Sequence, residues 1–447
     1  MRPLEWCLVL SFLPLIALAF APPRWRSSWR PLTLLPAGIA LLQVLWEGWR
    51  WQLLALYALA ALLPALSLLW RPLAARWPRW LGAAVLAGAI VSSTVLAAWA
   101  LPVITLPAPT GPYAVGVIDR ELVDTARNRR LMATIWYPAA ARGAPAPLTH
   151  YPDQLMVGMA HLTGMPGIVF QHLRYQTVAA SDEAPILPSE QPFPVLVFSH
   201  GLVGVRLQNA STLQDLASWG YIVLALDHTD AAAVTTFPDG ETRLYDLTRF
   251  GLPANEAPGA EAVEANLFPV WVADQQFAFD TLAAWQTTDP RFAGVLDLTQ
   301  LGAFGHSFGG ATALEVCRID ARCRAAADLD GGLYGGVRDQ PTAYPLLLMS
   351  SASSGANDVA QAAWQAAVER AEAPASWLEL PESSHLSFTD SELLSPLLPP
   401  RGFSPRAGLA MVNHDLRVFF DTYLRGEAGG QYNLPEATPS HTASTEG

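Results

Sequence analysis

The chain has 447 residues, of which 51% are hydrophobic and 15% are charged, and its formal net charge at pH 7 is −12. This length fits one large domain with an additional segment, and so apolar a composition is unusual for an ordinary soluble protein. The acidic balance argues against nucleic-acid binding, which requires a basic face for the phosphates.

The apolar excess lies in the first 106 residues, which contain two acidic residues, eight arginines and ten of the sixteen tryptophans. The remaining 341 residues carry nineteen arginines against thirty-seven acidic residues. Four apolar runs occur in the front segment: Trp6–Ala21, Leu32–Trp46, Gln52–Trp70 and Leu81–Leu106. A helix of about 20 apolar residues spans a bilayer, and the prolines in the two shorter runs are tolerated in such helices. We therefore predict about four transmembrane helices in residues 1–106.

The gaps between these runs are rich in tryptophan and arginine, as segments at a membrane–water interface are. The first and third gaps carry arginines and no acidic residue, at Arg24, Arg26, Arg30, Arg71, Arg76 and Arg79. Positive loops stay in the cytoplasm, so four spans place both chain ends, and the main domain, outside it. We expect a multi-pass protein of the bacterial inner (plasma) membrane whose main domain is extracytoplasmic. A cleaved signal peptide remains the alternative for the first run, because ALAFAPP resembles a small-residue cleavage site.

Residues 107–426 have the pattern of one α/β domain. Apolar runs such as FPVLVFS, YIVLALD and YPLLLMSS predict buried strands, and segments such as WVADQQFAFDTLAAW and HDLRVFFDTYLRG predict helices. Continuously apolar strands that alternate with helices indicate a mostly parallel sheet covered on both faces, with functional loops at the strand carboxyl ends. The tail from residue 427 to residue 447 is polar, and we expect it to be disordered.

A nucleophile motif lies within this domain. The segment Gly305–Gly309 reads GHSFG, which matches G-x-S-x-G, and it lies between an apolar strand, Leu301–Phe304, and a helix from Ala311. The nucleophile elbow of α/β-hydrolases requires this placement, because its serine sits on a tight strand-to-helix turn. The helix N-terminus then faces the developing oxyanion. We predict that Ser307 is the nucleophile; an ordinary glycine-rich turn is the alternative.

A serine hydroxyl needs a base to act as a nucleophile, and the order of residues in this fold is serine, acid, histidine. Three histidines follow the motif. His385 lies in a loop directly after an apolar strand, His414 begins the closing helix, and His441 lies in the polar tail. Only the first of these is at a strand carboxyl end, so we predict His385 as the base.

The acid is expected between Ser307 and His385. Asp330 ends the strand AAADLD, beside the strand of the elbow, and we favour it. Asp358 follows the next strand, YPLLLMSS, and is a competitor, whereas Asp328 lies deeper on the same strand as Asp330. The acid would fix the imidazole tautomer and stabilise the imidazolium.

Two backbone amides should bind the oxyanion. The loop after FPVLVFS reads HGL, where Gly201 permits a tight turn, so the amide of Leu202 would act with that of Phe308. For His200 we favour bracing of this loop over metal ligation, because no matching ligand cluster occurs. No dinucleotide-binding or phosphate-binding loop is present either, so we expect neither a cofactor nor a metal ion.

Three cysteines occur in the chain, and Cys7 lies in the first apolar run. Cys317 and Cys323 are six residues apart and could close a disulfide in an oxidising compartment. Two reduced thiols are the alternative.

Six sequence blocks occur together in an order that resembles the type II platelet-activating-factor acetylhydrolases and their bacterial dienelactone-hydrolase-like relatives. The blocks are GPYAVGV (Gly111–Val117), WYPA (Trp136–Ala139), FSHGL (Phe198–Leu202), GHSFGG (Gly305–Gly310), LD (Leu329–Asp330) and SSHLSFTD around His385. The resemblance covers about residues 107–426 and implies an α/β-hydrolase fold. It also implies a triad of Ser307, Asp330 and His385, and calcium-independent removal of short or oxidised acyl chains from phospholipids. The chain departs from eukaryotic members in its front segment and at LDHTDAA (Leu226–Ala232).

We therefore expect a serine ester hydrolase that acts on lipid-like esters, with an ester or phospholipid substrate and the membrane bilayer as its partners. A general carboxylesterase of the dienelactone-hydrolase kind, acting on small or polymeric esters, is the alternative among enzymes. A non-catalytic membrane sensor or binding module is the alternative of another class. The acyl length, the head group and the oligomeric state stay open.

Overall fold

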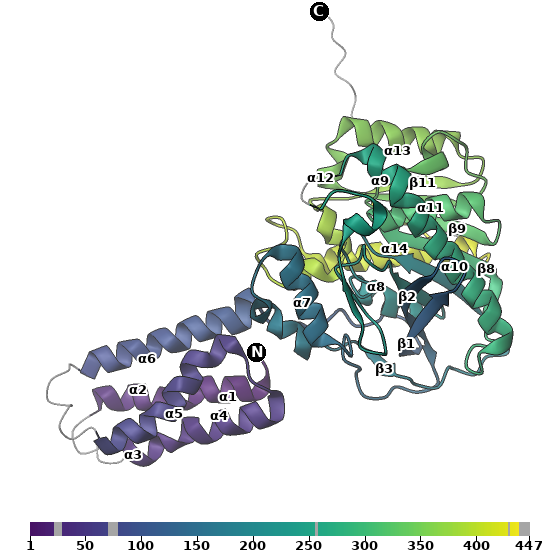
Figure 1. The fold of residues 1–447 in the computed structure, drawn as a ribbon. Coiled ribbons are helices and arrows are strands. Elements are labelled where there is room, and N and C mark those ends of the chain that lie inside the picture. Colours follow the sequence, from purple (N-terminus) through teal and green to yellow (C-terminus); the bar gives the residue numbers. More distant parts are fainter. Residues whose placement is uncertain (22–28, 70–78, 255–257, 428–429, 438–447) are drawn as a thin grey trace, which may run out of the picture. The chain divides into compact units, whose positions relative to one another are not determined.

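The computed structural model describes residues 1–21, 29–69, 79–254, 258–427 and 430–437, which divide into two compact units (Figure 1). A helical unit comprises Met1–Ile104 together with Ile168–Tyr175 and Leu394–Leu397, and an α/β unit comprises the other residues. Both short segments fall within the range 107–426 predicted for the α/β domain. Because these segments are far from the front helices in the sequence, the sequence does not indicate that they pack with those helices. Only the structure assigns them to the helical unit.

The four apolar runs of the front segment are helical over most of the residues that the structure describes. The helices are α1 (Pro3–Ser11), α2 (Leu13–Phe20), α3 (Trp29–Leu32), α4 (Leu34–Glu47), α5 (Leu54–Leu69) and α6 (Arg79–Thr94), with a 3-10 turn η2 (Trp51–Leu53) and a π-helical end η3 (Val95–Ala100). Pro14 lies at the start of α2 and Pro36 in the first turn of α4. Because proline lacks the N–H that would bond to the preceding turn, it favours a helix start at these two places.

One helix among the described residues is long and apolar enough to cross a membrane, Trp80–Ala100, with 21 residues and a mean hydropathy of 2.0. The apolar helices Pro3–Leu18, Leu34–Glu47 and Trp51–Ala65 are shorter. Among the described residues, the prediction of about four transmembrane helices is therefore not supported beyond this one. Four arginines on which the predicted orientation rests lie outside the described residues: Arg24, Arg26, Arg71 and Arg76.

The interior of the helical unit combines an apolar cluster with a buried ion pair. Leu8 and Leu53 belong to the cluster, while Arg50 Nη1 lies 3.3 Å from Glu5 Oε2, with neither side chain exposed. Large apolar side chains also point outward, and Leu45 and Trp46 are 76% and 83% exposed. Such an exposed apolar surface is typical of a site of membrane or protein contact.

The α/β unit is built on a nine-stranded sheet with the order β11-β10-β9-β8-β4-β5-β2-β1-β3. The six strands from β11 to β5 pair in parallel, whereas β2 pairs antiparallel with both β5 and β1. The strands are β1 (Ala114–Asp124), β2 (Arg129–Ala139), β3 (Ala180–Asp182), β4 (Phe193–Ser199), β5 (Ile222–Asp227), β8 (Leu296–His306), β9 (Cys323–Leu329), β10 (Leu346–Ser351) and β11 (Ala375–Leu380). A separate hairpin joins β6 (Val234–Thr236) to β7 (Thr242–Leu244).

Alternate residues of the central strands enter two cores, because successive side chains of a strand point to opposite faces. In β4, Leu196 and Phe198 join one core, and Val195 and Val197 join the other. Helices α8 (Ala210–Ser218) and α14 (Pro405–Tyr423) supply the first core, and α10 (Phe268–Thr288), α11 (Phe308–Ile319) and α13 (Asp358–Arg370) supply the second (Figure 1). The predicted mostly parallel sheet with helices on both faces is confirmed.

Shorter helical segments connect these elements. They are α7 (Pro152–Thr163), η4 (Gly167–Tyr175), η5 (Leu247–Phe250), α9 (Ala260–Asn266), η6 (Gly335–Arg338), α12 (Ala352–Gly355), η7 (His385–Phe388) and η8 (Asp390–Leu393). Two of them, α12 and η7, follow the carboxyl ends of β10 and β11, which is the edge of the sheet where the predicted site residues gather.

Part of the tail that the sequence predicts to be disordered contacts the edge of the sheet. Leu434 is buried, the N–H of Glu379 donates to the Pro435 carbonyl at 3.0 Å, and the N–H of Ala437 donates to the Trp377 carbonyl at 2.9 Å. Residues 435–437 thus lie along β11, the edge strand, whose outer backbone groups need partners. Composition does not reveal such pairing. Residues 438–447 lie outside the described residues.

Candidate active site

The turn from β8 into α11 places Ser307 at the carboxyl edge of the sheet. Ser307 follows the last residue of β8 and has φ 56° and ψ −124°, a strained conformation for a residue with a side chain. The turn depends on two glycines: a Cβ on Gly305 would overlap the backbone of Gly309, and one on Gly309 would overlap the backbone of Ser199. The Ser307 side chain is half-buried, so a substrate can reach it.

The neighbouring strand carries the acid to the same edge. Asp330 directly follows β9 and has a φ of 59°. Its Oδ2 lies 2.7 Å from Nδ1 of His385, whose side chain is 42% exposed while that of Asp330 is fully buried. The structure therefore brings these two predicted residues into a hydrogen bond that leaves Nε2 of His385 for another partner.

Three further donors surround the Asp330 carboxylate. The backbone N–H of Ser351 donates to Oδ1 at 2.7 Å, and the hydroxyls of Ser351 and Ser354 donate to Oδ2 at 3.0 and 2.9 Å. Burial by itself raises the pKa of Asp330, but the hydrogen bonds from His385 and Ser351 outweigh it and hold the pKa below the usual aspartate value. Asp330 is thus ionised near neutral pH and can stabilise an imidazolium.

The competing acids occupy other positions. Asp358 is exposed and begins α13. Asp328 is buried and accepts the N–H of Gly331 at 2.8 Å, and burial raises its pKa well above the usual value. His414 lies within α14 beside Asp415, and His441 lies outside the described residues. Among the described carboxylates, Asp330 is the one bonded to His385.

The loop after β4 passes against the elbow. A Cβ on Gly201 would lie 2.9 Å from Nδ1 of His306 and 3.3 Å from the Cβ of Ser307, so glycine permits this close approach of the loop to the elbow. Leu202 follows, and its side chain packs with Phe308 in one apolar cluster. Within the described residues, neither the Leu202 amide nor the Phe308 amide has an acceptor in the backbone network. Both predicted donors therefore lie next to Ser307, and their role at the oxyanion stays a prediction.

A family model described as platelet-activating factor acetylhydrolase, isoform II, matches residues 100–243 and 284–407. The two matched segments make up more than half of the chain and contain Leu202, Ser307, Asp330 and His385. The chain belongs to this family. Its sheet of mostly parallel strands, with the elbow at the end of β8, is the α/β-hydrolase fold.

Relatives of the chain carry names of the same kind. The platelet-activating factor acetylhydrolase of Cavia porcellus is 26% identical over 248 residues, which are 52% of this chain and 56% of that protein. A probable 1-alkyl-2-acetylglycerophosphocholine esterase of Arthroderma benhamiae is 26% identical over 322 residues, 64% of this chain and 76% of that protein. The chain thus spans little more than half the length of the first mammalian relatives.

A solved structure resembles most of the chain. It is a ferulic acid esterase from Streptomyces cinnamoneus, with 26% sequence identity and a TM-score of 0.60, and the match covers 75% of this chain and 97% of that protein. The fold of this family member is therefore shared with an esterase over nearly the whole length of that enzyme.

Two residues that sequence reasoning missed support His385, one directly and one through the other. Nε2 of His306 donates to the His385 carbonyl at 2.9 Å, the two rings are 4.6 Å apart, and the amide of Gln208 donates to Nδ1 of His306 at 3.1 Å. Burial lowers the pKa of His306 to about 3, so this ring stays neutral. The sequence feature that could have identified His306 is its position in the GHSFG motif, directly before Ser307.

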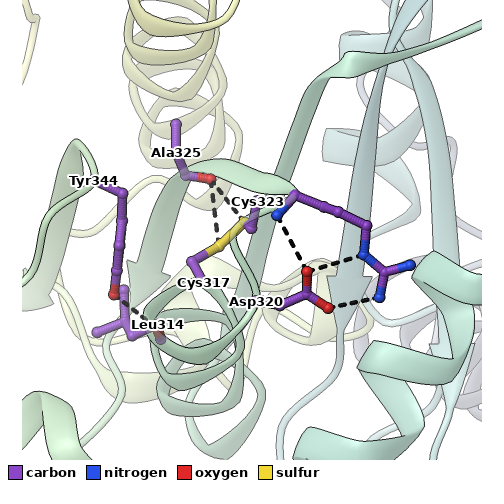
Figure 2. Close-up of a disulfide and its surroundings, with 7 residues drawn as sticks. Leu314, Cys317, Asp320, Cys323, Ala325 and Tyr344 are labelled. Atoms are coloured by element: carbon purple, nitrogen blue, oxygen red, sulfur yellow. Dashed lines mark hydrogen bonds and ion pairs between the residues drawn. A yellow bond between two sulfur atoms is a disulfide. The ribbon is translucent and has the colours of Figure 1, made fainter.

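Cys317, near the end of α11, and Cys323, the first residue of β9, are joined in a disulfide with Cα atoms 4.8 Å apart (Figure 2). Between them, Asp320 accepts hydrogen bonds from Arg322 at 2.9 and 2.6 Å. The disulfide connects the helix that starts after Ser307 to the strand that ends before Asp330. Cys7 is not part of it.

Proposed function

We propose that the chain is a serine ester hydrolase with Ser307 as nucleophile, His385 as general base and acid, and Asp330 as the carboxylate that orients His385. The observation that carries this proposal is the 2.7 Å hydrogen bond between His385 and Asp330, at the sheet edge where Ser307 occupies a nucleophile elbow. A binding module has no use for all three residues, so the arrangement favours catalysis.

In the proposed reaction, Ser307 Oγ bonds to the ester carbonyl carbon while its proton passes to Nε2 of His385. The carbonyl oxygen takes the displaced electron pair and is held by the amides of Leu202 and Phe308. His385 then gives its proton to the leaving alkoxide as the ester C–O bond breaks, which releases an alcohol and leaves an acyl-enzyme. Water repeats these steps, which releases a carboxylic acid and restores the serine. No metal ion takes part.

The substrate that we propose is a lipid-like ester, and a short-acyl phospholipid in particular. The names of the relatives, acetylhydrolase and alkylacetylglycerophosphocholine esterase, support this class. A second candidate is a general carboxylesterase acting on small or polymeric esters, and the likeness to a ferulic acid esterase over 97% of that enzyme favours it.

We also propose that the helical unit is a multi-pass anchor in the bacterial plasma membrane and that the α/β unit is extracytoplasmic. The span Trp80–Ala100 supports an anchor, as do the exposed apolar side chains of α4. The Cys317–Cys323 disulfide supports an oxidising compartment. Alkaline phosphatase fused to the C-terminus should be active and green fluorescent protein dark; the opposite pair of signals refutes this orientation.

The activity test uses the full chain in detergent. Wild type should hydrolyse p-nitrophenyl butyrate and a short-acyl phosphatidylcholine in the presence of EDTA, and a fluorophosphonate should label it. Ser307→Ala should lose both reactions to near background without loss of the melting transition. The matched control is Ser189→Ala, an exposed serine in the loop before β4, which should behave as wild type.

A different experimental result would contradict each part of the proposal. Retained turnover in Ser307→Ala would reject the nucleophile, and an unlabelled, inactive wild type would reject the enzyme. Faster turnover of methyl ferulate than of the phospholipid would favour the second candidate.

A further inference from the structure

Two histidines that take no part in the proposed triad are buried behind the loop that carries Leu202. His200 follows β4 and His228 follows β5, and because these strands are parallel neighbours the two rings are only 5.4 Å apart. Neither residue exposes any surface. Burial lowers the pKa of both, so both rings are neutral, and buried rings of this polarity require hydrogen-bond partners.

The tautomer of His200 follows from its partners. The backbone N–H of His228 donates to Nε2 of His200 at 3.1 Å. Since a backbone N–H can only donate, Nε2 is the acceptor and the proton is on Nδ1. Nδ1 therefore donates to the carbonyl of Gly201, 2.7 Å away.

The hydrogen bond that fixes the Gly201 carbonyl also fixes the direction of the Leu202 amide. The C=O of Gly201 and the N–H of Leu202 belong to one planar peptide unit, in which they point in opposite directions. A fixed carbonyl on the side of His200 therefore directs the Leu202 amide to the other side of the loop. The same carbonyl accepts the N–H of Gly204 at 2.8 Å, which closes the turn.

His228 is anchored in turn by a buried ion pair. Its Nδ1 lies 3.1 Å from Asp274 Oδ2, and Arg129 donates to both oxygens of Asp274 at 2.7 Å. Burial by itself raises the pKa of Asp274, but the charge of Arg129 more than offsets this and holds the pKa below its usual range. An ionised carboxylate only accepts, so Nδ1 of His228 is the donor, and Nε2 accepts from the Ser199 hydroxyl at 3.0 Å.

The segment after His228 holds the same loop through its backbone. The N–H of Val203 donates to the Ala231 carbonyl at 3.1 Å, and the N–H of Ala233 donates to the Gly204 carbonyl at 2.8 Å. The His228 ring also stacks on Trp271, with centroids 3.8 Å apart. The segment Leu226–Ala233 thus holds the loop that carries Leu202 through these contacts.

We propose that His200 and His228 are positioning residues that aim the Leu202 amide at the oxyanion, with the Asp274–Arg129 ion pair as their anchor. This inference rests on the proposed ester hydrolysis. Neither histidine reaches the substrate, so their loss should lower kcat and leave KM and the pH profile unchanged. Loss of one oxyanion donor lowers turnover by about 10²–10³-fold. A donor that is present but misdirected should therefore lower kcat by about 10–100-fold.

Two polar variants of His200 separate its two hydrogen bonds. In His200→Asn the side-chain amide reaches the former place of Nδ1 and can still donate to Gly201, whereas in His200→Gln it reaches the place of Nε2 and cannot. We expect kcat within about threefold of wild type for the asparagine variant and about 10–100-fold lower for the glutamine variant. The inhibition constant of a trifluoromethyl ketone, whose adduct carries an oxyanion, should rise by the same factor as kcat falls.

Further variants test the network. His228→Leu should lower kcat like His200→Gln, and the double variant should lose little more, because both act through one peptide unit. The matched control is Thr212→Val on α8, which removes a buried hydrogen bond of 2.8 Å to Asn413 and should leave kcat unchanged.

Amide hydrogen exchange of the peptide Gly201–Arg206 needs no substrate. It should be faster in His200→Gln than in wild type, His200→Asn and Thr212→Val. Equal kcat for the asparagine and glutamine variants, or unchanged exchange in the glutamine variant, would overturn the positioning role. An inactive wild type in which the exchange difference persists would reject the proposed function while supporting the bracing of the loop.

Discussion

Replacing Asp330 by asparagine should preserve the fold and place the proton of His385 on the wrong nitrogen. The backbone N–H of Ser351 donates to Oδ1 of Asp330 and cannot accept, so the amide oxygen of asparagine must take the Oδ1 position. The NH2 group then takes the Oδ2 position, 2.7 Å from Nδ1 of His385. It donates to Nδ1 and moves the imidazole proton to Nε2, which removes the acceptor for the Ser307 proton. The NH2 group has two hydrogens, so besides Nδ1 it can donate to one of the hydroxyls of Ser351 and Ser354 once that hydroxyl rotates to accept, and the other hydroxyl loses its bond to residue 330.

The size of the loss follows from this tautomer. In serine triads the wrong tautomer lowers kcat by about 10⁴-fold, which is about 5.5 kcal/mol of activation free energy. We expect the kcat of Asp330→Asn on p-nitrophenyl butyrate to fall by about 10³–10⁴, with KM within about threefold. The melting temperature should stay close to that of wild type, because three of the four hydrogen bonds to residue 330 remain possible.

The control for this experiment is the competing acid. Asp358 begins α13 and is exposed, so Asp358→Asn should keep kcat within about twofold of wild type. The reasoning is refuted if Asp330→Asn retains more than about a tenth of the turnover, and the acid moves to Asp358 if the two variants rank in the opposite order.

Three further predictions concern stability. Burial raises the pKa of Asp390 to about 7. Between about pH 4 and pH 7 the folded chain therefore keeps a proton that the unfolded chain has lost. The free energy of unfolding should fall by on the order of 4 kcal/mol as the pH rises through this range. Asp390→Asn should remove this fall, raising the melting temperature relative to wild type more at pH 8 than at pH 5; equal shifts at both pH values contradict it. Cys317→Ser should cost about 2–3 kcal/mol at most, and mass spectrometry of non-reduced protein should find Cys317 and Cys323 joined rather than open to alkylation. Glu5→Gln leaves the buried Arg50 without its 3.3 Å counter-charge and should destabilise the helical unit by about 3–5 kcal/mol, which a wild-type melting profile in detergent would contradict.

The sequence predicts those parts of the α/β unit that depend on local pattern. The apolar strands at Phe193–Ser199 and Ile222–Asp227 are visible because residues buried on both faces leave a continuous apolar run. The elbow is visible because its glycines and serine are adjacent in the chain. The front segment shows what local pattern does not predict. An apolar run indicates a helix, but it does not indicate that new helices begin near Pro14 and Pro36.

By itself, the sequence determined the family, the alternation of strands and helices along the chain, and a short set of candidates for the nucleophile, the base and the acid. Only the tertiary structure decided that Asp330 rather than Asp358 bonds to His385, that residues 435–437 lie along β11, and that His200 and His228 meet behind the Leu202 loop. The physical reason is the range of the interactions. Strand periodicity and glycine-dependent turns act between near neighbours in the chain, whereas the partners of a buried carboxylate or imidazole come from segments tens of residues away, which only the packed sheet brings within hydrogen-bonding distance.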